Sequence, residues 1–291
     1  MIKVIASDMD GTLLNNDHAF SAKTIESLKK ACSKGIRFMV VTGRNYISAL
    51  HPLEGTGLVC DYILSSGAEI RNPDKEVQMS ITLTFDECEY LYDKLKKYPL
   101  AIMFCSEQVN YILGTFEEAD NGLLDYIKFF HDTKDRDELR KTDLYKQMWD
   151  RTKVLADFES LRENNVPISK MFLVSDDWRM LLDIKKELEE NGNLAISSSF
   201  KNNLEITDIK AQKGPILKQY VESLGYTMDE VMVLGDSLND SSMLEMDFGA
   251  TIAMENADEE IKKIAKYITK SNEEDGVAYV IDEMLRMYGL E

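Results

Sequence analysis

Short apolar runs alternate with helix-like segments at the start of the chain, and this alternation constrains the fold more than any other feature. The runs are Ile2–Ser7, Phe38–Val41 and Tyr62–Leu64. Apolar residues recur at helical spacing from Ser21 to Gly35, and a second helix is expected from about Tyr46. This β-α-β-α-β order predicts a parallel sheet with right-handed crossover connections.

The same alternation returns near the end of the chain. A helix-like segment begins at Lys213 and ends at Gly225, and strand-like runs follow at Val231–Leu234 and Ala250–Ala253. A further helix is expected from Asp258 onward. Because both ends share one pattern, we expect them to form a single α/β core domain with a Rossmann-like parallel sheet.

Between about Thr82 and Phe200 the pattern changes to longer, charged helices mixed with strands, which predicts an inserted α+β cap domain. Its expected helices are Asp86–Lys97, Ala119–Phe130 and Trp178–Asn191, and its expected strands are Ala101–Cys105, Val109–Leu113, Lys170–Val174 and Leu194–Ser198. We place the core at residues 1–82 and 201–291 and the cap at residues 83–200. Residues 82–85 and 200–207 are the expected hinges, because the chain leaves and re-enters the core there.

Composition limits the partners that we expect. The chain has 34 Lys and Arg residues against 52 Asp and Glu residues, a formal net charge of −18. Nucleic acids and anionic membrane surfaces are bound through clustered basic side chains, so neither is an expected partner. A small anionic molecule remains compatible with this charge, because a few local donors can override a distant net charge.

The sequence predicts a cytoplasmic protein. No apolar run approaches the roughly 20 residues of a membrane helix, and aspartates by the eighth residue leave no room for a signal peptide. The four cysteines are widely spaced, so they indicate neither a zinc site nor a disulfide framework. Monomer and homodimer are both compatible with the sequence.

Two carboxylates follow the first strand, at Asp8 and Asp10. Side chains two positions apart on extended backbone point the same way, here toward the sheet edge where α/β folds bind ligands. Their repulsion favours a bound cation, and oxygen ligands without imidazoles favour Mg²⁺. The structural alternative is an Asx-turn at the Asp10-Gly11 pair.

Three further polar segments each follow a strand or open a helix. Thr42-Gly43-Arg44 can bind phosphate oxygens, although a Thr N-cap beside a surface Arg has the same sequence. Lys213 supplies a charge at a helix start, although a lone Lys is usually solvated. Asp236, Asn239 and Asp240 are suited to completing a cation site, although they also fit a polar loop.

The sequence resembles the haloacid dehalogenase-like (HAD) superfamily phosphatases through four motifs in a fixed order. They are Asp8-x-Asp10-Gly11-Thr12, Thr42-Gly43-Arg44, Lys213-Gly214 and Gly235-Asp236-x-x-Asn239-Asp240. The large insert resembles the cap of the Cof-type (type IIB) branch. Further marks of that branch are Leu204-Glu205-Ile206, Ala253-Met254-x-Asn256-Ala257 and Ser271-Asn272-x-x-Asp275-Gly276-Val277-Ala278. The resemblance spans the whole chain, although the middle third matches in size and position more than in motif.

The resemblance implies a role for each matching residue. Asp8 would be the nucleophile that forms an aspartyl-phosphate, and Asp10 would be the general acid and then the general base. The ligands of Mg²⁺ would be Asp8, the backbone carbonyl of Asp10 and Asp236, with Asp240 supporting them from nearby. The phosphate-binding groups would be Thr42, Lys213, Asn239 and the backbone N–H groups of Met9, Asp10 and Gly43.

Two positions depart from the usual pattern of the branch. Ser66 stands where an Asn commonly precedes Gly-Ala, and Glu255 stands where Gly is usual. Neither belongs to the four motifs, so they affect the expected substrate contacts and loop shape rather than the chemistry. Together with Arg44, Ser66 is a candidate for contacts on the substrate side.

The expected function is hydrolysis of small phosphorylated metabolites, such as sugar phosphates, by a Mg²⁺-dependent phosphomonoesterase. One alternative is a phosphosugar mutase of the same superfamily, which would return the phosphoryl group to the sugar. The other is a metabolite-binding regulator without activity. The intact set of Asp8, Asp10, Lys213 and Asp236 argues against that last alternative.

Overall fold

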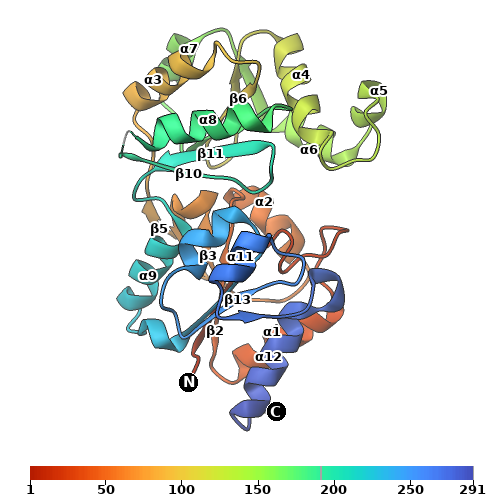
Figure 1. Ribbon diagram of the computed structural model, residues 1–291, viewed down its shortest axis with the longest axis vertical. Helices are drawn as coiled ribbons and strands as arrows, with labels where there is room; N and C mark the ends of the chain where they lie inside the picture. Colours follow the sequence, from red (N-terminus) through yellow and green to blue (C-terminus); the bar gives the residue numbers. More distant parts are fainter. Residues whose placement is uncertain (191, 291) are drawn as a thin grey trace. The chain divides into compact units, whose positions relative to one another are not determined.

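The computed structural model describes residues 1–190 and 192–290, and the chain divides into two compact units (Figure 1). Unit 1 comprises Met1–Ser80 and Lys210–Glu291, and unit 2 comprises Ile81–Ile209. In Figure 1, red and blue segments from the two ends of the chain build unit 1, and yellow and green segments build much of unit 2. Residues 191 and 291, at the ends of an expected helix and of the expected core, lie outside the described residues.

Unit 1 is built on a sheet of order β14-β13-β12-β1-β2-β3-β4-β5. The strands are β1 (Val4–Ser7), β2 (Arg37–Val41), β3 (Asp61–Leu64), β4 (Glu69–Arg71), β5 (Val77–Ser80), β12 (Val231–Gly235), β13 (Ala250–Ala253) and β14 (Tyr267–Ile268). Pairing is parallel from β14 to β3, which confirms the predicted α/β fold with a parallel-sheet core. The antiparallel strands β4 and β5, which extend the sheet beyond β3, were not expected from the sequence.

The helices of unit 1 connect these strands. They are α1 (Ala22–Ser33), α2 (Tyr46–Leu50), α9 (Lys213–Ser223), α10 (Ser241–Leu244), α11 (Glu259–Ile264) and α12 (Gly276–Met287), with 3₁₀ turns at His51–Leu53, Ser65–Gly67, Met228–Glu230, Leu238–Asp240 and Asn272–Glu274. Ser21 caps α1, because its side chain accepts a hydrogen bond from the backbone N–H of Thr24. Helices α1 and α12 pack together (Figure 1), and the central strands β1 and β12 are buried along their whole length.

Unit 2 contains a six-stranded sheet of order β10-β11-β9-β6-β7-β8. Its strands are β6 (Ala101–Cys105), β7 (Asn110–Leu113), β8 (Thr152–Leu155), β9 (Lys170–Val174), β10 (Leu194–Ser197) and β11 (Asn203–Asp208), and its helices are α3 (Phe85–Leu95), α4 (Phe116–Ile127), α5 (Arg136–Leu139), α6 (Asp143–Asp150), α7 (Phe158–Asn164) and α8 (Trp178–Glu189). Alternate residues of β9 pack into two different hydrophobic clusters. Leu173 joins the cluster formed with α3, α7 and α8, and Phe172 joins the one formed with α4, α5 and α6.

The expected return to the core at residue 201 is wrong by one strand. Strand β11 pairs antiparallel with β9 and with β10, so the chain rejoins unit 1 at Lys210. The physical reason is burial, because Leu204 and Ile206 pack into the core of unit 2. The expected hinge at 200–207 therefore falls largely on a paired strand, and on the entry side unit 2 begins at Ile81 rather than at residue 83.

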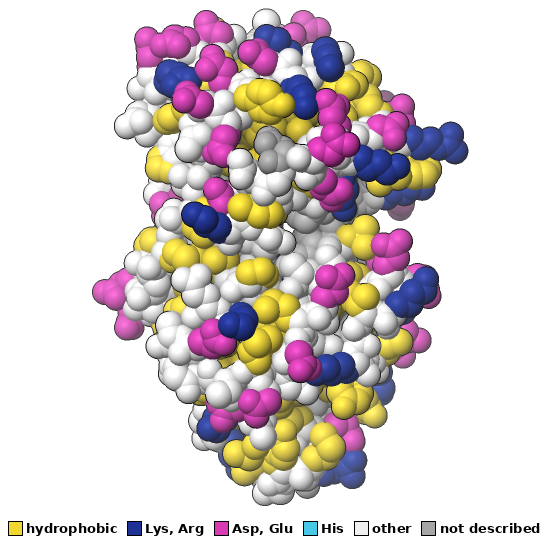
Figure 2. Space-filling model, turned by 60° about the vertical axis from the view of Figure 1, so that its left-hand side comes forward, with side chains coloured by type: hydrophobic (Ala, Val, Ile, Leu, Met, Phe, Trp, Pro, Cys, Tyr) yellow, Lys and Arg dark blue, Asp and Glu magenta, His cyan; other side chains and the backbone are white. Residues whose placement is uncertain are grey.

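Charged side chains of both signs are dispersed over the face drawn in Figure 2, and no large patch of a single sign gathers there. This dispersion matches the high content of both acidic and basic residues. Among the described residues, every helix is too short or too polar to span a lipid bilayer.

Candidate active site

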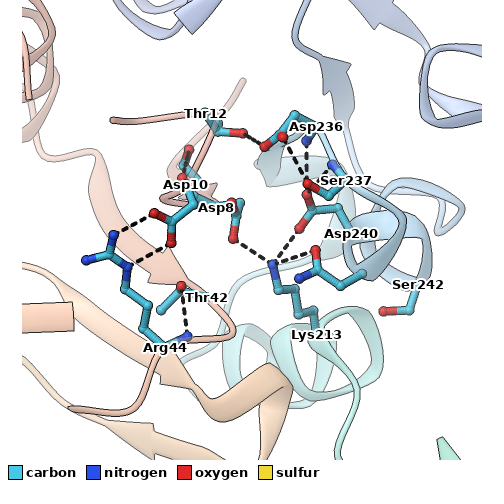
Figure 3. A network of polar contacts seen from close by, with 12 residues as sticks. Asp8, Asp10, Thr12, Thr42, Arg44, Lys213, Asp236, Ser237, Asp240 and Ser242 are labelled. Carbon is cyan, nitrogen blue, oxygen red and sulfur yellow. Dashed lines mark hydrogen bonds and ion pairs between the residues drawn. The ribbon is translucent and has the colours of Figure 1, made fainter. Parts of the chain in front are cut away.

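Three neighbouring strands of unit 1 bring the predicted polar segments to one edge of the sheet. Strand β1 ends immediately before Asp8, β2 before Thr42, and β12 immediately before Asp236. Because β12, β1 and β2 are adjacent and parallel, their carboxyl ends meet (Figure 3). The topology therefore gathers segments that lie more than 200 positions apart in the sequence.

Lys213 lies at the centre of this arrangement and is buried. Its Nζ atom donates to Oδ1 of Asp8 and to Oδ1 of Asp240, each at 2.6 Å, and approaches Oδ1 of Asn239 at 3.4 Å. Burial alone would lower the pKa of the ammonium, but the two carboxylates outweigh burial and raise it far above its ordinary value. Lys213 is therefore a fixed positive charge between the loop after β1, which carries Asp8, and the loop after β12, which carries Asp240. It is not a solvated surface residue.

The loop after β12 is organised by the carboxylate of Asp240. One oxygen binds Lys213, and the other accepts hydrogen bonds from the backbone N–H groups of Asp236 and Ser237, at 2.9 and 3.1 Å. Asp236 in turn accepts hydrogen bonds from the hydroxyls of Thr12, at 2.6 Å, and Ser237, at 2.9 Å. These contacts fix both carboxylates, and the two groups that bind Asp236 are neutral hydroxyls rather than cations.

The loop after β1 and the loop after β12 pack closely, which explains why two of the motif positions are glycine. Gly11 has φ +76°, and a Cβ atom there would lie 2.4 Å from Oδ2 of Asp236. At Gly235, a Cβ atom would lie 2.6 Å from the Cγ atom of Asp240. A side chain at either position would push away a carboxylate of the site, so both positions require glycine.

The site can hold a cation. Carboxylate oxygens of Asp8, Asp236 and Asp240 lie within 4.8 Å of one another. Burial raises the pKa of Asp8 well above its ordinary value, opposed by Lys213 and reinforced by Asp240, and burial together with Asp240 raises the pKa of Asp236 to about 7. Such carboxylates are crowded beyond what one ammonium neutralises, and their hard oxygen atoms suit a divalent cation such as Mg²⁺.

Asp10 faces a different partner. Arg44 donates from Nε to Oδ2 at 2.7 Å and from Nη2 to Oδ1 at 2.5 Å, and Nδ1 of His18 lies 3.7 Å from Oδ1 (Figure 3 shows the arginine pair). Partial burial raises the pKa of Asp10, but His18 and Arg44 outweigh it and hold that pKa well below its ordinary value. In this arrangement Asp10 is a carboxylate, available to accept a proton.

The segment after β2 is held by the loop after β3. The hydroxyl of Thr42 accepts a hydrogen bond from the backbone N–H of Arg44 at 3.1 Å, and the Thr42 carbonyl accepts one from Ser66 at 3.0 Å. Ser65 and Ser66 both have left-handed backbones, with φ of 49° and 63°. Ser66 is buried beside Thr42, so it lies next to the site, whereas the predicted substrate-side residue Arg44 lies on Asp10.

Sequence reasoning predicted most members of this constellation and missed three supporting groups. His18 carried no signal, because a lone His without a second ligand predicts no site; its side chain is 60% exposed, and its Nδ1 atom lies 3.7 Å from Oδ1 of Asp10. Sequence reasoning also left out the side chains of Thr12 and Ser237, which bind Asp236. The later branch motifs also contact the loop after β1, since Asn256 donates to the carbonyl of Gly11 at 2.8 Å and Asn272 to that of Leu14 at 2.9 Å.

Comparison with known proteins agrees with this geometry. A sequence model described as haloacid dehalogenase-like hydrolase matches residues 5–281. The 5-amino-6-(5-phospho-D-ribitylamino)uracil phosphatase YwtE of Bacillus subtilis is 32% identical over 291 residues, which cover 98% of each protein.

Solved structures show the same fold. A haloacid dehalogenase-like hydrolase from B. subtilis superposes with a TM-score of 0.85 at 28% identity, covering 98% of this chain and 100% of that one. A sugar phosphatase of HAD subclass IIB superposes with a TM-score of 0.76 at 22% identity, covering 99% of this chain and 100% of that one. At that lower identity, the second likeness concerns the fold alone.

Proposed function

The chain belongs to the haloacid dehalogenase-like hydrolases, as a Cof-type phosphatase, and from this premise we propose that it is a Mg²⁺-dependent phosphomonoesterase of small phosphorylated metabolites. The proposal assigns an aspartyl-phosphate intermediate and a specific role to each residue of the site. Its substrate class is sugar phosphates or molecules of similar size and polarity.

One observation carries the proposal: Lys213 binds Asp8 and Asp240 at once, with Asp236 beside them. A buried carboxylate next to a fixed ammonium and a set of cation ligands is what attack on a phosphate dianion requires. Without those positive charges, Asp8 would be an anion approaching another anion. Phosphoryl transfer depends mainly on such positioning and neutralisation of charge.

In the first step, a carboxylate oxygen of Asp8 forms a bond to phosphorus and the bond from phosphorus to the alcohol oxygen breaks. Protonated Asp10 gives its proton to that alcohol oxygen as it leaves. The negative charge of an arriving phosphate favours the protonated form of Asp10, which the site without substrate disfavours. Thr42, Asn239 and the backbone N–H groups of Met9, Asp10 and Gly43 are the proposed donors to the phosphoryl oxygens.

In the second step, a water molecule gives a proton to Asp10 and its oxygen attacks phosphorus. The bond between phosphorus and Asp8 then breaks, which releases inorganic phosphate and restores both aspartates. Lys213 remains beside Asp8 throughout and offsets the charge that returns to its carboxylate.

The proposed ligands of Mg²⁺ are Asp8, the backbone carbonyl of Asp10 and Asp236, with Asp240 in support. When bound, the cation would neutralise charge on the transferring phosphoryl group. The contacts of Asp240 fit a supporting role, because both of its oxygens already accept hydrogen bonds from Lys213 and from backbone N–H groups.

A screen of phosphorylated metabolites with added Mg²⁺, ranked by kcat/KM, tests the proposal. Release of phosphate from an aryl phosphate and from a subset of metabolites, and its loss in EDTA, are the expected results. Failure to release phosphate from any of them would contradict the proposal. Interconversion of sugar 1- and 6-phosphates without free phosphate would identify a mutase instead, and tight binding without turnover would identify a regulator.

A further inference from the structure

The guanidinium of Arg44 contacts Asp10 through two parallel hydrogen bonds. Nε and Nη2 reach the two different carboxylate oxygens, at 2.7 and 2.5 Å. A planar fork facing a planar carboxylate restricts rotation of that carboxylate. Each oxygen keeps a second lone-pair direction, so Asp10 can still accept a proton from water while Arg44 holds it.

Arg44 is itself held on the opposite side. Its Nη1 atom donates to the carbonyl of Ser48 at 3.1 Å, and its backbone carbonyl accepts a hydrogen bond from the N–H of Ser65 at 2.9 Å. The side chain of Arg44 is 22% exposed, whereas that of Asp10 is 47% exposed. The arginine is therefore the better anchored of the two partners, and it orients the aspartate rather than the reverse.

We propose that Arg44 is a positioning residue that holds the carboxylate of Asp10 in the orientation needed for proton transfer. The inference rests on the proposed role of Asp10 as general acid and base, and it gives Arg44 a task other than binding substrate. Because Thr42 lies two residues before Arg44 and bonds to its backbone, one short turn serves both the phosphoryl group and the proton-transfer group.

Replacing Arg44 separates this role from phosphate binding. An arginine that binds the substrate phosphate would, when removed, raise KM. An arginine that orients Asp10 would, when removed, lower kcat, because misplacement of a general acid and base costs on the order of 10²–10⁴-fold. Lysine keeps the charge but cannot form two parallel bonds, so Arg44→Lys tests orientation separately from charge.

The experiment uses the full-length protein with Mg²⁺ and the sugar phosphate that the metabolite screen ranks highest, because an alcohol leaving group needs the proton of Asp10. We expect Arg44→Ala to lower kcat about 100-fold or more with KM changed less than about threefold. Arg44→Lys should retain less than a tenth of the kcat of the unmodified protein. Added guanidinium ion should restore part of the kcat that Arg44→Ala loses. In an Asp10→Asn background, Arg44→Ala should reduce kcat less than twofold further, because both changes remove the same function.

Arg37 provides the matched control. It forms the same two-bond pair with Asp61, at 2.6 and 2.7 Å, but at the other end of β2. Arg37→Ala should lower the melting temperature and leave kcat within about twofold. Equal losses of kcat in the Arg37 and Arg44 variants would show that Arg44 acts only through stability, and would overturn the inference.

Other outcomes separate the inference from the proposed function. A rise in KM at unchanged kcat, or additive losses in the Asp10→Asn background, would overturn the inference while leaving the phosphatase assignment standing. Unchanged kinetics in Arg44→Ala would do the same. Absence of turnover by the unmodified protein would overturn the proposed function, and the positioning role with it.

Discussion

The Nζ atom of Lys213 lies 2.6 Å from Oδ1 of Asp8, although 205 positions separate the two residues in the sequence. Lys213 is the first residue of α9 and Asp8 follows β1, so this contact joins the two segments that form unit 1. The same ammonium neutralises Asp240. Stability and chemistry therefore both depend on the ammonium group of Lys213.

Lys213→Met should destabilise the protein strongly in EDTA. It removes the ammonium and leaves Asp8 and Asp240 buried without it, a change that typically costs about 3–5 kcal/mol. Added Mg²⁺ should restore part of the free energy of unfolding, because a cation at the carboxylates replaces some of the lost charge. Denaturant titrations with and without Mg²⁺ measure both effects.

Lys94→Met is the control for that substitution. Lys94 pairs with Glu187 at 2.9 Å, but their side chains are 29% and 44% exposed. Such a pair contributes about 0–1 kcal/mol, so the variant should unfold almost as the unmodified protein does. Equal stability of Lys213→Met and the unmodified protein in EDTA would contradict the role given to Lys213.

Asp8→Asn should abolish phosphate release while preserving the fold. The amide keeps an oxygen that can accept from Lys213 but cannot form an aspartyl-phosphate, so turnover should fall at least about 10³-fold. Because burial and Asp240 make the Asp8 charge unfavourable, the melting temperature should stay the same or rise. A variant that keeps more than a few per cent of the original kcat would show that Asp8 is not the nucleophile.

Stability without metal should fall as the pH rises from about 4 to about 7. The pKa of Asp236 is raised to about 7 in the folded protein, against about 4 when unfolded. Between these values the folded state keeps a proton that the unfolded state has lost, so raising the pH favours unfolding by up to about 1.4 kcal/mol per pH unit. Melting temperatures in EDTA from pH 5 to pH 8 test this slope.

Two changes should remove that pH dependence. Asp236→Asn eliminates the titrating group, and Mg²⁺ holds the carboxylate in its ionised form. A flat curve for the unmodified protein in EDTA, or an unaltered slope in Asp236→Asn, would assign the effect to other groups.

Gly11→Ala should impair both stability and activity. The new Cβ atom would lie 2.4 Å from Oδ2 of Asp236, on a backbone with φ +76°. Gly35 has φ +84°, and a Cβ atom there would meet no neighbouring atom within 4 Å, so Gly35→Ala isolates the left-handed backbone, worth about 1–2 kcal/mol. Only Gly11→Ala should also lower phosphate release, by about tenfold or more, and equal activity in the two variants would contradict this.

The fold of unit 1 could be predicted because its central strands are apolar and buried. The observed strand Val231–Gly235 and the predicted Val231–Leu234 differ by one residue. Strand β11 was assigned to the wrong unit, since alternation in Leu204-Glu205-Ile206 indicates a strand but not its partners. The short strand Glu69–Arg71 was missed because three residues carry too little periodicity to be recognised.

The membership of the site was easier to predict than its contacts. Motif order identified Asp8, Lys213 and Asp236, which the sheet topology then brings to one edge. The direction of Arg44 depends on the Ser48 carbonyl in a helix of only five residues, which no local pattern specifies. His18 reaches Asp10 because its loop folds back, with Leu14 bridging Phe20, a contact invisible in the sequence.

The position of β1 between β2 and β12 has a consequence for synthesis on the ribosome. Strands β1 and β2 emerge first, and all of unit 2 must be translated before β12 exists. Throughout that interval the nascent chain carries an apolar strand with one edge unpaired, the kind of surface that chaperones cover. A ribosome that stalls before Asp240 leaves a chain without one of the two carboxylates that bind Lys213, so the site can form only after Asp240 has been translated.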